Sequence, residues 1–131
     1  MYNYILFQII FVIRNPRDCL VSFFNHARVV KGYTGSFDLC ADAFLNNDWL
    51  YRTPYMQNVM SYWDKRDEPN IMFITFEEMK RDLPKVIKKV SSFLGKPVAE
   101  NDIPTLADFL SFENMKANPT MNKQQTVDVS T

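Results

Sequence analysis

Two short polar segments carry the residue types that could do chemistry in this sequence, and each directly follows an apolar run. Residues 14–17 (RNPR) form the first segment, and residues 76–78 (FEE) form the second. Arg14 carries a planar, permanently charged fork that matches the oxygen atoms of a phosphate. Free backbone N–H groups at the start of a following helix would add further donors. The first segment therefore predicts an anion-binding arrangement.

Ser22 is a second candidate ligand for the same anion. In a helix that starts at Pro16, Ser22 lies about 9 Å further along the axis. An arginine side chain spans much of that distance, so Arg14 and Ser22 can grip one phosphate. An alternative stays open, in which Arg14 makes a structural ion pair and Ser22 merely faces solvent.

The elements that must position these residues are predicted to alternate between strand and helix. Residues 9–13 (IIFVI) and 71–76 (IMFITF) are short apolar runs of the kind that fill a parallel sheet. Capping residues and helical spacing predict helices over residues 16–30, 37–46, 54–63, 77–82 and 83–94, with one or two short helices between 102 and 116. This order predicts an α/β layer structure with parallel strands, in which ligands sit beyond the carboxyl ends of the strands. Both polar segments fall at such ends.

Apolar residues at helical spacing predict which face of each helix turns inward. The predicted inner faces are Cys19, Leu20, Phe23 and Phe24; Phe37, Cys40, Ala41 and Phe44; Met56, Val59, Met60 and Trp63; and Val86, Ile87, Val90, Phe93 and Leu94. Lys85, Lys88 and Lys89 lie opposite the last of these faces, where we expect a solvated surface.

The composition limits the classes of protein that the sequence can encode. The 131 residues are 47% apolar, which fits one domain with a core. Fifteen basic and fifteen acidic residues give no net charge, so total charge predicts neither a nucleic-acid nor an acidic-membrane partner. Cys19 and Cys40 are too few for a disulfide framework, and we expect reduced thiols in a cytoplasmic protein. The apolar run at residues 1–13 is too short to span a membrane and lacks the features of a secretion signal.

Three segments together resemble one family, the cytosolic sulfotransferases. Residues 10–24 (IFVIRNPRDCLVSFF) are similar to its 3′-phosphate-binding segment. Residues 76–80 (FEEMK) resemble its Tyr-Glu-Asp-Met-Lys stretch, and residues 111–119 (SFENMKANP) resemble its Ser-Phe-Lys-Glu-Met-Lys-Lys-Asn-Pro stretch. The resemblance implies a P-loop nucleotide-kinase-like α/β fold, a parallel sheet with flanking helices. It also implies transfer of a sulfuryl group from 3′-phosphoadenosine-5′-phosphosulfate (PAPS) to a hydroxyl or amine of a small molecule, with adenosine 3′,5′-bisphosphate (PAP) as product.

The resemblance also implies roles for individual residues of the nucleotide site. Arg14 and Ser22 would bind the 3′-phosphate, Phe112 would stack on the adenine, and Ser111 and Met115 would belong to the same binding segment. Two further positions of the adenine side depart from the pattern of the family. Phe76 stands where tyrosine is usual, and Leu110 stands where threonine is common. These changes remove hydroxyl groups, so we expect weaker binding with stacking retained.

This sequence matches only part of the family pattern. The resemblance therefore predicts a partial sulfotransferase domain over residues 1–131. The phosphosulfate loop and the catalytic histidine would lie upstream of Met1, and the Arg-Lys-Gly loop and dimerisation motif downstream of Thr131, so we assign no catalytic or metal-binding residue here. His26 follows Ser22, which is the wrong order for the base, and we expect it near the acceptor pocket. We expect an incomplete core, in which the edge of the strand at residues 9–13 is exposed. Marginal stability or association of the chain would follow. The tail at residues 119–131 is expected to fray.

Three hypotheses follow for the function. The leading one is a cytoplasmic PAPS-dependent sulfotransferase, of which this chain carries the 3′-phosphate and adenine half of the nucleotide site. Its acceptor would be a phenol, steroid or alcohol, and neither a nucleic acid nor a membrane would be a partner. The full-length form would form a homodimer. The second is an inactive fragment or paralogue that regulates or dimerises with an intact sulfotransferase. The third is a small membrane-anchored protein that uses its apolar start.

Overall fold

The structure, a computed structural model, describes residues 7–46 and 54–120. The chain divides into two compact units, Met1–Glu77 and Glu78–Thr131, which are described separately. The division into one partial domain stays a prediction. Most of the tail predicted to fray, residues 121–131, lies outside the described residues.

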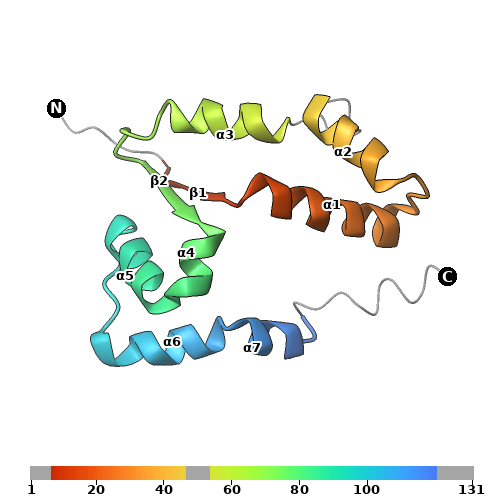
Figure 1. Cartoon of the computed structure of the whole chain (residues 1–131). Helices are drawn as coiled ribbons and strands as arrows, with labels where there is room; N and C mark the ends of the chain where they lie inside the picture. The colour runs from red at the N-terminus through yellow and green to blue at the C-terminus, as the bar shows by residue number, and fades with distance from the viewer. Residues whose placement is uncertain (1–6, 47–53, 121–131) are drawn as a thin grey trace. The chain divides into compact units, whose positions relative to one another are not determined.

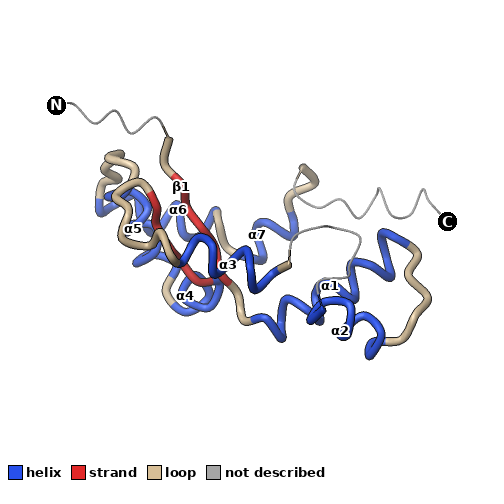
Figure 2. Tube along the Cα trace, turned by 90° about the horizontal axis from the view of Figure 1, so that it is seen from above, coloured by secondary structure: helices blue, strands red, loops and turns tan. Residues whose placement is uncertain are grey.

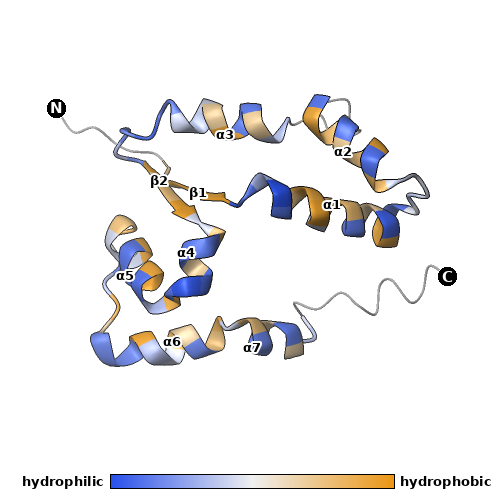
Figure 3. Ribbon diagram, viewed as in Figure 1, coloured by the Kyte–Doolittle hydropathy of each residue, from blue (hydrophilic) through white to orange (hydrophobic). Residues whose placement is uncertain are grey.

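A two-stranded parallel sheet lies in the first unit, as the sequence predicts. Strand β1 (Ile9–Ile13) pairs with β2 (Ile71–Thr75), and Ile13 lies beside Thr75 at the carboxyl ends. The strands run side by side (Figures 1 and 2), and both are apolar along most of their length (Figure 3). Met72 and Ile74 of β2 are buried, whereas Val12 of β1 is 50% exposed. The prediction of two strands is confirmed, although β1 is only partly covered.

Helices α1 (Pro16–Lys31) and α2 (Phe37–Asn46) begin and end at the residues that the sequence marks. The side chain of Asn15 accepts a hydrogen bond from the N–H of Arg17, and Gly32 ends α1 in the left-handed region at φ 65°. The two helices pack through their predicted inner faces, with Phe24 against Phe37 at 5.2 Å between ring centroids. Cys40 is fully buried, and both cysteines are free.

Helix α3 (Tyr55–Trp63) turns inward a face that overlaps only in part with the one predicted. Met56 and Met60 are 52% and 51% exposed, whereas Tyr62 stacks on Phe11 of β1 at 4.3 Å between ring centroids. Trp63 is 44% exposed, but its ring lies 5.4 Å from that of Phe73 of β2, as a residue of the predicted inner face should. The prediction was wrong for the two methionines because α3 carries two adjacent stripes at helical spacing, and the stripe with the tyrosines also turns inward. Large aromatic rings bury more area than methionine side chains. Thr53, the predicted cap, lies outside the described residues.

Helix α4 (Phe76–Arg81) follows β2 without a loop, so Phe76 belongs to the helix rather than to the strand. In the second unit, α5 (Leu83–Phe93) is followed by a 3₁₀ turn (Glu100–Asp102), α6 (Ile103–Phe109) and α7 (Phe112–Ala117). These elements match the predicted order of helices.

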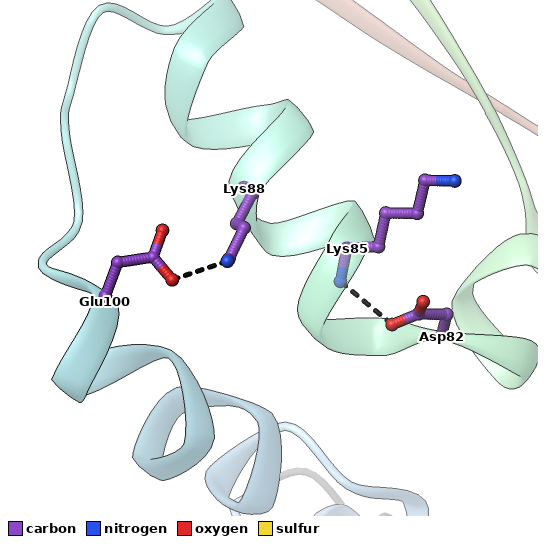
Figure 4. Close-up of polar contacts among 4 residues, drawn as sticks. All are labelled: Asp82, Lys85, Lys88 and Glu100. Atoms are coloured by element: carbon purple, nitrogen blue, oxygen red, sulfur yellow. Dashed lines mark hydrogen bonds and ion pairs between the residues drawn. The ribbon is translucent and has the colours of Figure 1, made fainter.

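The amphipathic arrangement predicted for α5 is confirmed except at Leu94, which was placed on the inner face but follows the last residue of the helix and is 38% exposed. Val86 is buried, as is Ile103 of α6 in the same unit. The carboxylate of Asp82 accepts a hydrogen bond from the backbone N–H of Lys85 at 3.1 Å, and the Nζ of Lys88 lies 2.5 Å from Glu100 (Figure 4). All three lysines of the outer face are exposed, as expected. Within residues 7–46 and 54–120, no helix is long and apolar enough to cross a membrane.

Candidate functional site

The two polar segments that follow the strands meet at one edge of the sheet. Because β1 and β2 are parallel and Ile13 lies beside Thr75, the next residues, Arg14 and Phe76, also come together. The guanidinium carbon of Arg14 lies 4.4 Å from the centroid of the Phe76 ring. The backbone N–H of Asn15 donates a hydrogen bond to the Glu77 carboxylate at 2.9 Å. Both segments therefore lie at the carboxyl ends of the strands, as the sequence predicts, and the structure brings them into contact.

The Arg14 side chain retains unused hydrogen-bonding capacity. It is partly buried, and its guanidinium stacks on an aromatic ring, an arrangement that holds a cation without neutralising it. In the part of the chain that the structure describes, Arg14 makes no ion pair with a carboxylate, and its buried Nε has no hydrogen-bond partner. The structural ion pair considered from the sequence is therefore not found among these residues. A buried donor of this kind favours an anionic ligand.

Two of the backbone donors expected at the start of α1 are already in use. The N–H of Asn15 is bound by Glu77, the N–H of Arg17 is bound by the Asn15 side chain at 3.0 Å, and Pro16 has none. The expectation of free groups was therefore wrong for Asn15 and Arg17, because side chains of this chain satisfy their N–H groups. The Asn15 N–H, the backbone N–H of Glu77 itself and the nearby charge of Arg14 hold the pKa of Glu77 below its usual value. At the same edge, the Nε of Arg14 keeps a donor without a partner among the described residues.

Ser22, the second predicted phosphate ligand, lies exposed on α1. Because it is exposed, its hydroxyl is accessible to a ligand two turns into the helix.

The remaining predicted site residues lie in the second unit, around the junction of α6 and α7. The hydroxyl of Ser111 accepts a hydrogen bond from the N–H of Asn114 at 3.3 Å and so caps α7. Leu110, Phe112 and Met115 are 39%, 60% and 40% exposed. These four residues place a capped helix start next to accessible apolar side chains, which suits the stacking of a flat ring.

Lys80 is a neighbour of Phe112 to which the sequence analysis assigned no role. Its Nζ lies 4.6 Å from the centroid of the Phe112 ring, in the geometry of a cation–π contact. The two residues are far apart in the sequence, so spacing gave no signal of the contact. Within residues 7–46 and 54–120, no group of three His, Cys, Asp or Glu side chains could hold a metal ion.

Tyr55 is another residue that the sequence analysis missed. Its hydroxyl accepts a hydrogen bond from the backbone N–H of Arg14 at 3.2 Å and donates one to the carbonyl of the same residue. No local motif marks this tyrosine. Glu77, in contrast, was part of a segment selected for its place after β2, although no role was assigned to it.

The sequence of this chain is similar to that of known proteins. The family model described as the sulfotransferase domain matches residues 6–130. The luciferin sulfotransferase of Photinus pyralis is 40% identical over 121 residues, which cover 92% of this chain and 32% of that protein. The amine sulfotransferase of Oryctolagus cuniculus is 33% identical over 117 residues, which cover 88% of this chain and 38% of that protein.

Solved structures of sulfotransferase relatives share the fold. Retinol dehydratase, in complex with androsterone and the inactive cofactor PAP, aligns with a TM-score of 0.84 and 33% identity over 91% of this chain and 35% of that one. A mouse sulfotransferase complexed with PAP aligns with a TM-score of 0.80 and 32% identity over 86% of this chain and 41% of that one. The chain thus spans about a third to two fifths of the length of these relatives. With a matching domain model, relatives and fold, the chain belongs to the sulfotransferase family.

Proposed function

We propose that this chain forms the 3′-phosphate and adenine half of the nucleotide site of a PAPS-dependent sulfotransferase. The observation that carries the proposal is the Arg14 side chain, which follows β1, stacks on Phe76 and keeps a buried Nε without a partner among the described residues. Relatives crystallised with PAP support the identity of the ligand. In the whole protein, a sulfuryl group passes from PAPS to a hydroxyl or amine of a small molecule.

Different residues are assigned to the 3′-phosphate and to the adenine. Arg14 binds the 3′-phosphate through its guanidinium, and the Ser22 hydroxyl adds a further hydrogen bond. Phe112 stacks on the adenine, with Leu110, Ser111 and Met115 in the same binding segment. Phe76 supports Arg14 instead of donating a hydrogen bond to the base, because it has no hydroxyl.

The chemical step needs groups beyond those assigned here. Sulfuryl transfer requires a base for the acceptor hydroxyl and donors for the charge that develops on the 5′ side of the nucleotide. We assign neither role to a residue of this chain. The names of the luciferin and amine sulfotransferases support a small-molecule acceptor. A phenol, steroid or alcohol as acceptor, a homodimer and a cytoplasmic location stay predictions.

A calorimetric titration with two nucleotides tests the proposal. Adenosine 3′,5′-bisphosphate carries the 3′-phosphate, whereas 5′-AMP lacks it. We expect the native protein to bind the bisphosphate about tenfold or more tightly than 5′-AMP, because a charge-assisted contact adds to the affinity. Arg14→Ala should abolish this preference and leave the affinity for 5′-AMP unchanged.

Arg28→Ala is the matched control for that variant. Arg28 also lies over an aromatic ring, that of Phe24 at 5.6 Å, but near the far end of α1. We expect it to leave both affinities unchanged. Equal binding of the two nucleotides by the native protein, or equal effects of the two arginine variants, would contradict the proposal.

A further inference from the structure

The hydroxyl of Tyr55 holds both polar groups of the Arg14 backbone. The N–H of Arg14 donates to the tyrosine oxygen at 3.2 Å, and the tyrosine O–H donates to the Arg14 carbonyl. Arg14 is the first residue after β1, where the chain leaves the sheet and turns into α1. One side chain from α3 therefore restrains the backbone at the point that aims the guanidinium.

Aromatic packing fixes the position of this hydroxyl. The Tyr55 ring stacks on Phe44 of α2, with 5.8 Å between centroids and 28° between planes. The ring centroid of Phe44 in turn lies 6.4 Å from that of Phe23 of α1. A tyrosine held in this way has few rotamers left, so its O–H stays where the strand ends.

The protonation state of Tyr55 suits the donation to the carbonyl. Burial is the main cause that raises the pKa of Tyr55 above its usual value, and the hydrogen bond with Cys19 and the charge of Glu77 act in the same direction. The backbone contact with Arg14 partly offsets them. The side chain is thus a neutral phenol near pH 7. The Cys19 thiol lies 3.9 Å from the same carbonyl and is a weaker second donor.

We propose that Tyr55 is a positioning residue for phosphate recognition, whose hydroxyl fixes the Arg14 backbone so that the guanidinium is held ready for the 3′-phosphate. This inference rests on the proposed function, because it requires that Arg14 binds the 3′-phosphate. A side chain ordered before binding loses less conformational entropy when the ligand arrives. Tyr55 acts through Arg14 and need not touch the nucleotide.

Tyr62 offers a matched comparison on the same helix. It is also partly buried, and its ring also packs on the sheet, 4.3 Å from Phe11. Among the described residues its hydroxyl has no hydrogen-bond partner, so Tyr62→Phe removes the same atom without loosening Arg14.

The test measures how Tyr55→Phe changes the two affinities obtained by calorimetry. We expect the affinity for adenosine 3′,5′-bisphosphate to fall about tenfold, because two hydrogen bonds are lost, and the affinity for 5′-AMP to stay unchanged. Tyr62→Phe should change neither. In the Arg14→Ala background, Tyr55→Phe should have no further effect, because the residue through which it acts is gone. A merely structural tyrosine would lower thermal stability and leave the ratio of the two affinities intact.

The results distinguish a failure of the proposed function from a failure of the role inferred for Tyr55. If the native protein binds both nucleotides equally, the proposed function fails, and the role of Tyr55 in phosphate recognition fails with it. If the native protein prefers the bisphosphate but Tyr55→Phe keeps that preference, or adds its full effect to that of Arg14→Ala, the inference alone is overturned.

A second variant keeps the test decisive should Tyr55→Phe not fold. Phe44→Leu leaves the tyrosine hydroxyl in place but removes the ring on which it stacks. We expect a smaller loss of the same kind, in the bisphosphate affinity only. An unchanged ratio of affinities in a folded Phe44→Leu protein would count against the inference.

Discussion

Glu77 places a carboxylate beside the residue that we propose to bind a phosphate. It satisfies the Asn15 N–H and lies in the field of Arg14, so it orders the turn after β1. The same charge repels an incoming anion at the start of α1. The phosphate is therefore expected to approach Arg14 from the side of its guanidinium rather than along the axis of the helix.

The lowered pKa of Glu77 predicts a dependence of stability on acid. A carboxylate with a lowered pKa in the folded state stabilises that state above the ordinary pKa of about 4.3, and the stabilisation is lost as the pH falls through the lowered value. The difference in melting temperature between the native protein and Glu77→Gln should be constant above about pH 5 and shrink below about pH 4. Thermal unfolding at a series of pH values measures it. Glu68→Gln, which changes an exposed glutamate before β2, should show no such trend.

Phe112 is expected to contribute to affinity in a way that differs from Arg14. If the adenine stacks on this ring, Phe112→Leu weakens the binding of adenosine 3′,5′-bisphosphate and of 5′-AMP by the same factor, about tenfold. The preference between the nucleotides then stays intact, whereas Arg14→Ala removes it. Phe109 is a matched control, since it is 61% exposed where Phe112 is 60%. Calorimetry should find no change for Phe109→Leu, and equal losses for both variants would argue against stacking on Phe112.

At the scale of elements, the sequence correctly predicts the features that residues close together in the sequence determine. Asn15, Gly32, Asp82 and Gly95 mark helix ends through their own side chains or backbone freedom, and the structure has the helices there. The inward face of α3 was predicted wrongly for Met56 and Met60, because two neighbouring stripes both fit a helix and only the packing partner decides between them.

The candidate site shows the same division between local and long-range signals. Arg14 was selected because a charged residue directly follows a buried strand, which is visible in the sequence. The contact of Tyr55 with Arg14 spans 41 positions, and nothing near either residue encodes it. That contact depends on how α2 and α3 return toward the sheet, which the sequence pattern does not specify.

The cap of α5 gives a prediction at this scale. Asp82→Ala removes the acceptor of the Lys85 N–H and should lower the free energy of unfolding by about 1 kcal/mol. Asp102→Ala is the control, because Asp102 precedes α6 but its side chain makes no capping hydrogen bond. We expect it to cost only a few tenths of a kcal/mol through the helix dipole. Urea unfolding of both variants measures the difference, and equal costs would show that the Asp82 cap adds nothing.

At the scale of the whole molecule, the sheet leaves one strand partly open. Among the described residues β1 pairs only with β2, and Val12 is 50% exposed. An apolar strand with a free edge favours pairing with another chain. This supports the expectation of self-association in the 131-residue chain.

A pair of valine variants tests that expectation. Val12→Lys places a charge on β1 and should reduce self-association, seen as a lower average mass in sedimentation velocity at high concentration. Val30→Lys makes the same change at a valine of equal exposure, 50%, on α1. It should leave the average mass of the protein unchanged. Equal effects of the two variants would assign the association to general hydrophobicity rather than to the strand.

The contacts that surround Arg14 also have a consequence for folding kinetics. The Asn15 contact with Glu77 joins residues 62 apart, and the Tyr55 contact joins residues 41 apart. Contacts at such separations require closure of a long loop, so they form late in folding. The arrangement around Arg14 is therefore expected to be complete only late in folding. Nucleotide would bind the native state alone, and adding it should slow unfolding while the rate of folding stays the same.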